Sequence, residues 1–181
     1  LNENLKAASS IQKSFLPAPS LHSDNFKIAS FWDPAHVLGG DIFNAIKAKD
    51  RIIFYIVDVC GHDVPSALVT VSISQFFNQL ANRSRALSPK EMMRTLNKEY
   101  PLDRFDRYFS IFYMVVDPVS GHFEYSSAGH PPAIILSKKG AITLLDRCGT
   151  IIGFNQIVDE DHLLFEEGKG VLQQGDKVFL Y

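Results

Sequence analysis

The sequence is poor in cysteine and has no long apolar run, and both absences exclude classes of protein. Its two cysteines, Cys60 and Cys148, lack the spacing of a metal-binding motif and provide no disulfide framework. No apolar segment approaches the length of a membrane span, and no secretory signal is visible. We therefore expect a protein of a reducing, cytoplasmic setting that does not associate with a membrane.

An excess of charge of one sign is also missing. The 18 basic and 20 acidic residues are interspersed and give a formal net charge of −2. Without a basic patch there is no electrostatic footprint for nucleic acid, so we expect no nucleic-acid partner. What the chain does have is 181 residues, of which 46% are hydrophobic. That is long enough for one domain with a sizeable core.

The most informative stretch is a predicted hairpin. Residues 52–57 are consecutive apolar residues, which predicts a strand buried on both faces, and this strand ends at Asp58. If Lys49 and Asp50 form a two-residue hairpin loop, the register places Asp41 directly opposite Asp58. A three-residue loop would shift this pairing by one residue. Directly opposed residues share a face of the sheet, with Cβ atoms roughly 4.5–5.5 Å apart.

Two carboxylates at that separation repel each other. Either one of them takes up a proton with a raised pKa, or a hard cation binds between them. We favour the cation, and we expect Asp41 and Asp58 to supply oxygen ligands to Mg²⁺ or Mn²⁺. The alternative is a pair of surface carboxylates at strand ends, each solvated or capping the next helix.

The first segment of the chain is predicted to be an amphipathic helix. Apolar or small residues recur at three- and four-residue steps through residues 1–16, and Pro17 ends the pattern. Two interpretations stay open: the helix packs on its own domain, or it continues upstream as a coiled-coil linker from a sensor or receiver domain. Its apolar stripe also suggests a homodimer. We divide the chain into a helical linker, residues 1–16, and one globular domain, residues 17–181.

The rest of the pattern predicts an α+β fold. Asp63, with Pro65 in the first turn, marks a helix start, and Ser88 opens a capping-box sequence. The mixed charges of residues 103–108 suggest a solvated loop without chemistry. Alternating or apolar runs bounded by turn residues predict strands at residues 26–32, 108–116, 122–127, 133–136, 141–145, 162–165 and 177–181.

Four motifs, in order, carry a family resemblance. Residues 39–44 (Gly-Gly-Asp-Ile-Phe-Asn), 58–68 (Asp-Val-Cys-Gly-His-Asp-Val-Pro-Ser-Ala-Leu), 128–132 (Ala-Gly-His-Pro-Pro) and 175–181 (Gly-Asp-Lys-Val-Phe-Leu-Tyr) resemble those of bacterial PP2C-like serine/threonine phosphatases. The branch is that of SpoIIE and RsbU, which regulates sigma factors. The resemblance implies a four-layer α-β-β-α sandwich of two mainly antiparallel sheets flanked by helices, with a metal site at one edge of the sheets.

The resemblance also implies roles for individual residues. Two Mn²⁺ or Mg²⁺ ions share Asp58, with Asp41 and the backbone carbonyl of Val59 as further ligands, and activate a water that attacks phosphorus. His62 either donates a proton to the leaving serine oxygen or only shapes the loop. His36 stands where many relatives carry arginine, and it either holds the substrate phosphate or is an ordinary loop residue.

The resemblance further implies that the chain is the output domain of a signalling protein. Its substrate would be a phosphoserine on an anti-anti-sigma-type regulator. His130 is interpreted as a residue that locks a turn, and Cys60 is a poor nucleophile because the arginine of a cysteine-phosphatase loop is missing.

Three departures from the family pattern support a second hypothesis. Asp63 stands where the family has a glycine, and it either caps a helix or adjusts the metal affinity of the site. Asn44 stands where an aspartate is frequent. The sequence also stops at Tyr181, where relatives continue into Thr-Asp-Gly and a third metal-binding aspartate, so we expect a domain truncated at its C-terminus. The second hypothesis is a catalytically weak or inactive PP2C-fold module that sequesters a regulatory partner.

Overall fold

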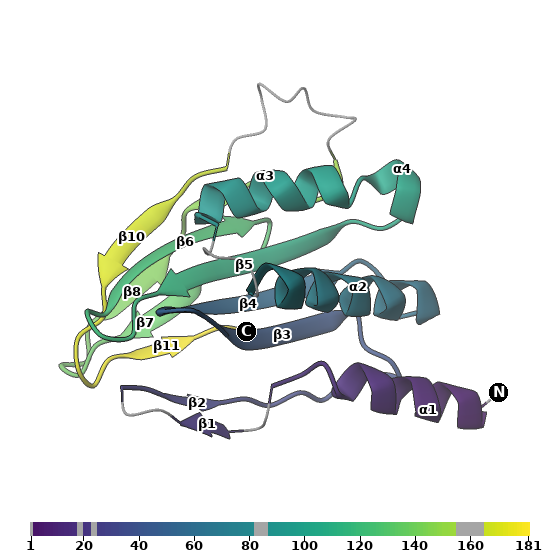
Figure 1. Ribbon diagram of the computed structural model, residues 1–181, viewed down its shortest axis with the longest axis horizontal. Coiled ribbons are helices and arrows are strands. Elements are labelled where there is room, and N and C mark those ends of the chain that lie inside the picture. Colours follow the sequence, from purple (N-terminus) through teal and green to yellow (C-terminus); the bar gives the residue numbers. More distant parts are fainter. Residues whose placement is uncertain (1, 18–19, 23–24, 82–86, 155–164) are drawn as a thin grey trace.

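The computed structural model describes residues 2–17, 20–22, 25–81, 87–154 and 165–181 (Figure 1). Its centre is a six-stranded sheet. The strand order is β10 (Gly168–Val171), β6 (His122–Ala128), β5 (Phe109–Val116), β4 (Arg51–Val59) and β3 (Asp41–Ala48), with β9 (Cys148–Gly149) parallel to β6. A three-stranded sheet has the order β11 (Lys177–Phe179), β7 (Ala133–Leu136) and β8 (Ile142–Leu145), and β1 (Ser20–His22) pairs with β2 (Lys27–Ala29).

The hairpin of β3 and β4 has the predicted register. Ala48 pairs with Arg51, and Asp41 pairs with Asp58. The two-residue turn forms although it lacks glycine, because Lys49 adopts a left-handed backbone conformation with φ of 56°. The prediction of a two-residue loop is therefore confirmed, and with it the opposition of the two carboxylates.

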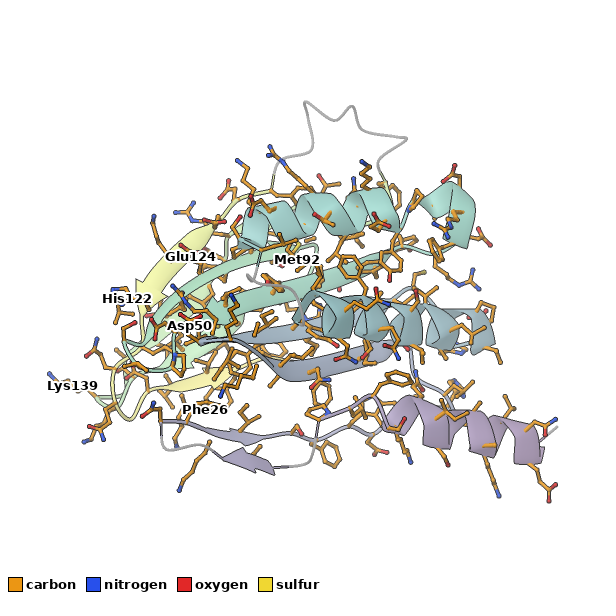
Figure 2. The ribbon with its side chains drawn as sticks, viewed as in Figure 1. Phe26, Asp50, Met92, His122, Glu124 and Lys139 are labelled. Atoms are coloured by element: carbon orange, nitrogen blue, oxygen red, sulfur yellow. The ribbon has the colours of Figure 1, made fainter. Side chains whose placement is uncertain are left out.

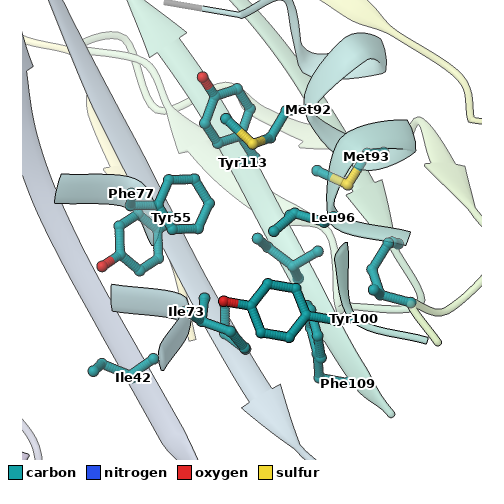
Figure 3. Packing of buried hydrophobic residues seen from close by; sticks show 14 of the residues in the cluster. Ile42, Tyr55, Ile73, Phe77, Met92, Met93, Leu96, Tyr100, Phe109 and Tyr113 are labelled. Carbon is teal, nitrogen blue, oxygen red and sulfur yellow. The ribbon is translucent and has the colours of Figure 1, made fainter. Parts of the chain in front are cut away.

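Helices cover one face of the six-stranded sheet. α2 (Val64–Ala81) contacts β3 and β4, and α3 (Pro89–Glu99) contacts β5 and β6. Aromatic rings fill the space between them: Tyr55 stacks on Phe77 with ring centroids 4.0 Å apart, and both rings are buried (Figure 3). The predicted capping box of α3 is present, because the Ser88 side chain accepts from the Glu91 backbone N–H while the Glu91 carboxylate accepts from that of Ser88.

The three-stranded sheet packs on the opposite face. Its inward residues Ile135 and Leu145 join a second apolar cluster with Phe112, Met114 and Tyr125 of the central sheet. The predicted α+β class, with two mainly antiparallel sheets and flanking helices, is thus confirmed.

Some predicted elements differ from the structure. The predicted strand at 26–32 is shorter, Lys27–Ala29, and its partner β1 was not predicted. Residues 103–108 were predicted to be a loop, but a four-residue helix, α4 (Leu102–Phe105), forms there after Pro101 at the N-cap position. Three residues of the strand predicted at 162–165, namely 162–164, lie outside the described residues.

The N-terminal helix α1 (Asn2–Lys13) packs on the domain through its last turns. Gln12 is 2% exposed, and Phe15 and Leu16 lie against the helix-side core. Ile11, in contrast, is 60% exposed. Within the described residues, no helix combines the length and the apolar character that crossing a membrane requires.

Candidate metal centre

The two predicted metal ligands lie at one end of the central sheet, on the face that the second sheet covers. Alternation along β3 and β4 points Ile42 and Val57 into the helix-side core, so Asp41 and Asp58 point to the other side. Ser110 of β5 pairs with Asp58 and extends this polar row across a third strand. The carboxylates therefore sit at an edge between the two sheets, where side chains and solvent both reach them.

The electrostatics of this pair disfavour a negative charge on Asp41. The pKa of Asp41 is raised to about 6 by partial burial, by the negative charge of Asp58, and by a hydrogen bond with Asp58 that requires a proton. A bound cation would relieve the same repulsion. In the described residues no group of three or more His, Cys, Asp or Glu side chains could hold a metal ion. The carboxylate donors at this site are therefore the two of Asp41 and Asp58.

Backbone oxygens at the end of β4 and in the loop after it lie close to Gly40, the residue before Asp41. A Cβ atom added to Gly40 would clash with the carbonyl oxygen of Gly61 and lie 2.8 Å from that of Val59. The Val59 N–H also donates to the Gly40 carbonyl, at 2.9 Å. Glycine at position 40 thus allows the loop after β4 to lie directly against the residue before Asp41. The two opposed carboxylates offer only oxygen atoms, which fits Mg²⁺ or Mn²⁺.

The loop after β4 is tied to the start of α2. Asp63 accepts a hydrogen bond from the Ser66 backbone N–H at 3.1 Å, so its predicted capping role is confirmed. Gly61 has φ of 97°, which reverses the chain between Asp58 and this cap. The Ser66 hydroxyl lies within hydrogen-bonding distance of both the Cys60 carbonyl, at 2.9 Å, and the Asp63 carboxylate, at 2.7 Å.

Sequence analysis missed Arg107, which holds this loop from outside. Its guanidinium forms an ion pair with Asp63 at 2.7 Å and donates to the Ser66 hydroxyl at 3.2 Å. The hydrogen bonds from Ser66, with a smaller contribution from Arg107, lower the pKa of Asp63 to about 2. Arg107 and Asp63 are 44 positions apart, and no local pattern could have joined them.

The two histidines singled out from the sequence are brought together. The rings of His36 and His62 have centroids 4.3 Å apart and planes inclined by 32°, and both residues are exposed. His62 lies in the loop that follows Asp58 and Val59. The residue expected to hold phosphate and the residue expected to donate a proton therefore share one surface at the loop that follows Asp58.

His130 links the two sheets. Its Nε2 lies 3.2 Å from the backbone carbonyl of Tyr181, and its Nδ1 lies 2.8 Å from the Ser110 hydroxyl. A carbonyl oxygen only accepts, so the proton is on Nε2 and the Ser110 hydroxyl donates to Nδ1. Burial lowers the pKa of His130 and favours this neutral form. The Ser127 hydroxyl donates to the His130 carbonyl at 2.9 Å and accepts from the His130 N–H at 3.3 Å. Both contacts hold the backbone of the turn, which agrees with a turn-locking role for this residue.

Asn44 is remote from the metal face. It lies on the opposite side of β3 from Asp41, and its side-chain amide donates to the Phe15 carbonyl at 3.1 Å. This residue, at which the chain departs from the family pattern, therefore fixes the segment that follows α1.

A two-sheet α+β sandwich with opposed carboxylates at the edge between its sheets defines a PP2C-like domain. Among protein families, the family described as Stage II sporulation protein E (SpoIIE) matches residues 48–181. The chain belongs to this family.

Individual relatives agree with this assignment. The chain is 31% identical over 155 residues to phosphoserine phosphatase RsbP of Bacillus subtilis, covering 82% of the chain and 38% of RsbP. It is 26% identical to phosphoserine phosphatase RsbU of the same organism over the whole chain and 52% of RsbU. It therefore spans about half or less of these relatives. The SiaA-PP2C domain of Pseudomonas aeruginosa has the same fold, with a TM-score of 0.70, 20% identity and coverage of 98% of this chain and 69% of that one.

Proposed function

We propose that this chain is the phosphatase domain of a metal-dependent protein serine/threonine phosphatase. The observation that carries the proposal is the direct opposition of Asp41 and Asp58, with a raised Asp41 pKa and the Val59 carbonyl beside Gly40. Two relatives named phosphoserine phosphatases support the reaction class. A negatively charged pair that shares a proton in the absence of metal is suited to exchange that proton for a divalent cation.

Each residue has a proposed role. Asp41, Asp58 and the Val59 carbonyl hold Mn²⁺ or Mg²⁺, which when bound neutralises phosphoryl charge and activates water for in-line attack. His62 donates a proton to the serine oxygen that leaves. His36 orients the substrate phosphate through a ring N–H, with its ring plane supported by the neighbouring His62 ring.

The proposed substrate is a phosphoserine on an anti-anti-sigma-type protein, as the family resemblance implies. We further propose that residues 1–16 connect the domain, residues 17–181, to an upstream sensor or receiver domain in a cytoplasmic signalling protein. The exposed Ile11 on α1 supports contact with another helix, and a homodimer through α1 is the simplest such arrangement.

A second candidate function is a catalytically weak PP2C-fold module that sequesters a regulatory partner. Two observations favour it. Only two carboxylates come together at the site within the described residues, and the carboxylate of Asp63 is already occupied by a hydrogen bond from Ser66 and an ion pair with Arg107. A two-metal hydrolytic site normally needs more carboxylate oxygens than one such pair provides.

The test is phosphate release from a phosphoserine protein by the protein that contains this chain. It is measured with Mn²⁺, with EDTA, and with the variants Asp58→Asn and Asp50→Asn. Asp50 is a matched control because it lies in the turn at the far end of the same hairpin (Figure 2). We expect metal-dependent turnover that Asp58→Asn abolishes and Asp50→Asn retains. Absence of turnover in the folded protein with either metal would favour the sequestering module instead.

A further inference from the structure

A cavity beside the candidate metal centre has no role in the proposed chemistry. It has a volume of about 410 Å³ and lies between α1 and the segment of residues 33–37. Its α1 wall contains Lys6, Ser9, Ser10 and Lys13, and His36 belongs to the opposite wall. A volume of this size accommodates a side chain or a short peptide segment of a ligand.

The cavity is connected to the candidate site through His36. One side of this residue lines the cavity, and its ring also lies against the His62 ring, with 4.3 Å between centroids. His62 lies in the loop that follows Asp58 and Val59, the last two residues of β4. A ligand peptide that fills the cavity would therefore pass the rings of His36 and His62 on its way to the Asp41 and Asp58 carboxylates.

The charge of the cavity is positive. Lys6 and Lys13 lie seven positions apart on α1, which is two helical turns, so both project from one face of the helix. Neither lysine forms an ion pair within the described residues. Lys13 is held over the ring of Trp32, with 5.8 Å from Nζ to the ring centroid. Asp33 also lines the cavity, so two ammonium groups face one carboxylate.

A hydroxyl side chain separates the two lysines on the cavity wall. Ser9 lies between the two lysines, lines the cavity and is only 9% exposed. The neighbouring Ser10 hydroxyl, which also lines the cavity, donates to the Lys6 carbonyl at 3.1 Å. A hydroxyl on the wall between two ammonium groups can donate a hydrogen bond to an oxyanion that they attract.

We infer that this cavity, defined by Lys6, Ser9, Lys13 and His36, binds an acidic segment of the protein substrate, a glutamate or aspartate carboxylate close to the phosphoserine. The identity of this ligand rests on the proposed function, because phosphoserine at the carboxylate pair brings the flanking residues to the cavity. The helix α1 then has a second task besides connecting domains: it selects substrates with acidic residues beside the phosphorylated serine.

The experiment measures binding rather than turnover. Two fluorescein-labelled phosphoserine peptides, identical except for glutamate or glutamine at the flanking positions, are titrated by fluorescence anisotropy. The protein carries Asp58→Asn throughout, so neither peptide is hydrolysed. We expect the glutamate peptide to bind on the order of tenfold more tightly, as two lysines at a partly enclosed site allow, and this preference to weaken at high salt.

Three variants locate the effect. Lys6→Glu combined with Lys13→Glu should abolish the preference for the glutamate peptide, and Ser9→Ala, which keeps every charge, should reduce it roughly threefold. Lys139→Glu is the matched control, because Lys139 lies at the opposite end of the molecule from α1 (Figure 2). Circular dichroism of each variant verifies folding. If the variant with both Lys6→Glu and Lys13→Glu does not fold, Ser9→Ala still tests whether the cavity contributes to the preference.

The possible outcomes separate this inference from the proposed function. Equal binding of the two peptides to the starting protein overturns the cavity assignment, and so does an equal loss of preference in the Lys139→Glu control. A preference that depends on the cavity lysines in a protein without phosphatase activity would support the cavity while rejecting the enzyme. Turnover of p-nitrophenyl phosphate by the protein without Asp58→Asn tests the enzyme alone.

Discussion

The side chain of Gln12 hydrogen-bonds both backbone polar groups of Gly39. Its Nε2 donates to the Gly39 carbonyl at 2.7 Å, and its Oε1 accepts from the Gly39 N–H at 3.0 Å. Nε2 also donates to the Thr70 hydroxyl at 2.9 Å. One buried amide therefore joins α1, α2 and the segment that enters β3 two residues before Asp41.

We predict that Gln12→Ala destabilises the domain by about 2–3 kcal/mol, because it leaves the buried N–H and C=O of Gly39 without partners. The measurement is urea unfolding followed by tryptophan fluorescence, which reports on Trp32. Gln79→Ala, at an exposed position of α2, is the control and should change the unfolding free energy by less than about 0.5 kcal/mol. Equal effects of the two substitutions would contradict the importance of this contact.

Asp41 should make the metal-free domain less stable as the pH rises. Its pKa of about 6 lies above the ordinary value of 3.8 for an aspartate, so folding favours the protonated form. The stability that this proton provides is full below about pH 4 and is lost as the pH rises through about 6.

The corresponding variant is Asp41→Asn. In EDTA at pH 7.5 it should be more stable than the wild type by about 1 kcal/mol, the scale of repulsion between solvent-exposed charges. The difference should disappear below about pH 3, well under the ordinary pKa of 3.8, because the wild-type carboxyl is then protonated in both the folded and the unfolded state. Added Mn²⁺ should reverse the order by stabilising only the wild type. A wild type that is the more stable form in EDTA at pH 7.5 would rule out this account of the pair.

Gly40→Ala should weaken metal binding. The added methyl group would clash with the Gly61 carbonyl and crowd the Val59 carbonyl, so the loop after β4 must move away from Asp41. Isothermal titration with Mn²⁺ should show an affinity at least about tenfold lower, a loss of roughly 1.4 kcal/mol.

Gly140→Ala is the control for this substitution. Gly140 has no atom within 4 Å of an added Cβ, although its φ of 86° makes alanine strained there. We expect this variant to lose stability and to keep its Mn²⁺ affinity. If both alanine variants bind Mn²⁺ like the wild type, the close approach at Gly40 has no part in the metal site.

The Asp63–Arg107 pair should stabilise the loop that carries His62. Asp63→Ala removes a helix cap and an ion pair, and we expect the melting temperature at pH 7 to fall by roughly 2–4 °C. Because the pKa of Asp63 is lowered to about 2, this contribution is present above about pH 4 and is lost as the pH falls toward 2.

A double-mutant cycle with Arg107→Ala isolates the pair from the cap. The two substitutions should be less than additive, since each removes the same ion pair. Asp106→Ala is the control on the side of Arg107: its carboxylate also contacts the guanidinium, at 3.3 Å, but it is almost fully exposed. Strict additivity of Asp63→Ala and Arg107→Ala would show that the ion pair does not contribute.

Much of the fold follows from local patterns in the chain. The capping box at Ser88, the cap at Asp63 and the apolar run of residues 52–57 each report a local steric or burial requirement, and each element formed where it was predicted. The opposition of Asp41 and Asp58 could be predicted as well, because a hairpin propagates its register along both strands. The one uncertainty was the turn, which Lys49 resolves by adopting positive φ.

The contacts around the site could not be predicted in this way. Arg107 with Asp63, Asn44 with Phe15, and His130 with Tyr181 are 44, 29 and 51 positions apart. The mixed charges of residues 103–108 indicate a solvated loop, and they do not show that Arg107 binds Asp63. A charged side chain gives the same sequence pattern whether it faces water or a distant carboxylate.

By itself the sequence determined most of the elements, the register of the first hairpin and the pair of carboxylates, since periodicity and turn chemistry act over a few residues. Only the tertiary structure decided which face of the sheet the second sheet covers, where α1 packs, and which side chains from distant segments meet around the carboxylates. The physical reason is that those contacts depend on how whole layers stack. Stacking is driven by the burial of apolar area. This driving force is non-directional and many sequences supply it equally well, so the sequence pattern does not show which surfaces pack together.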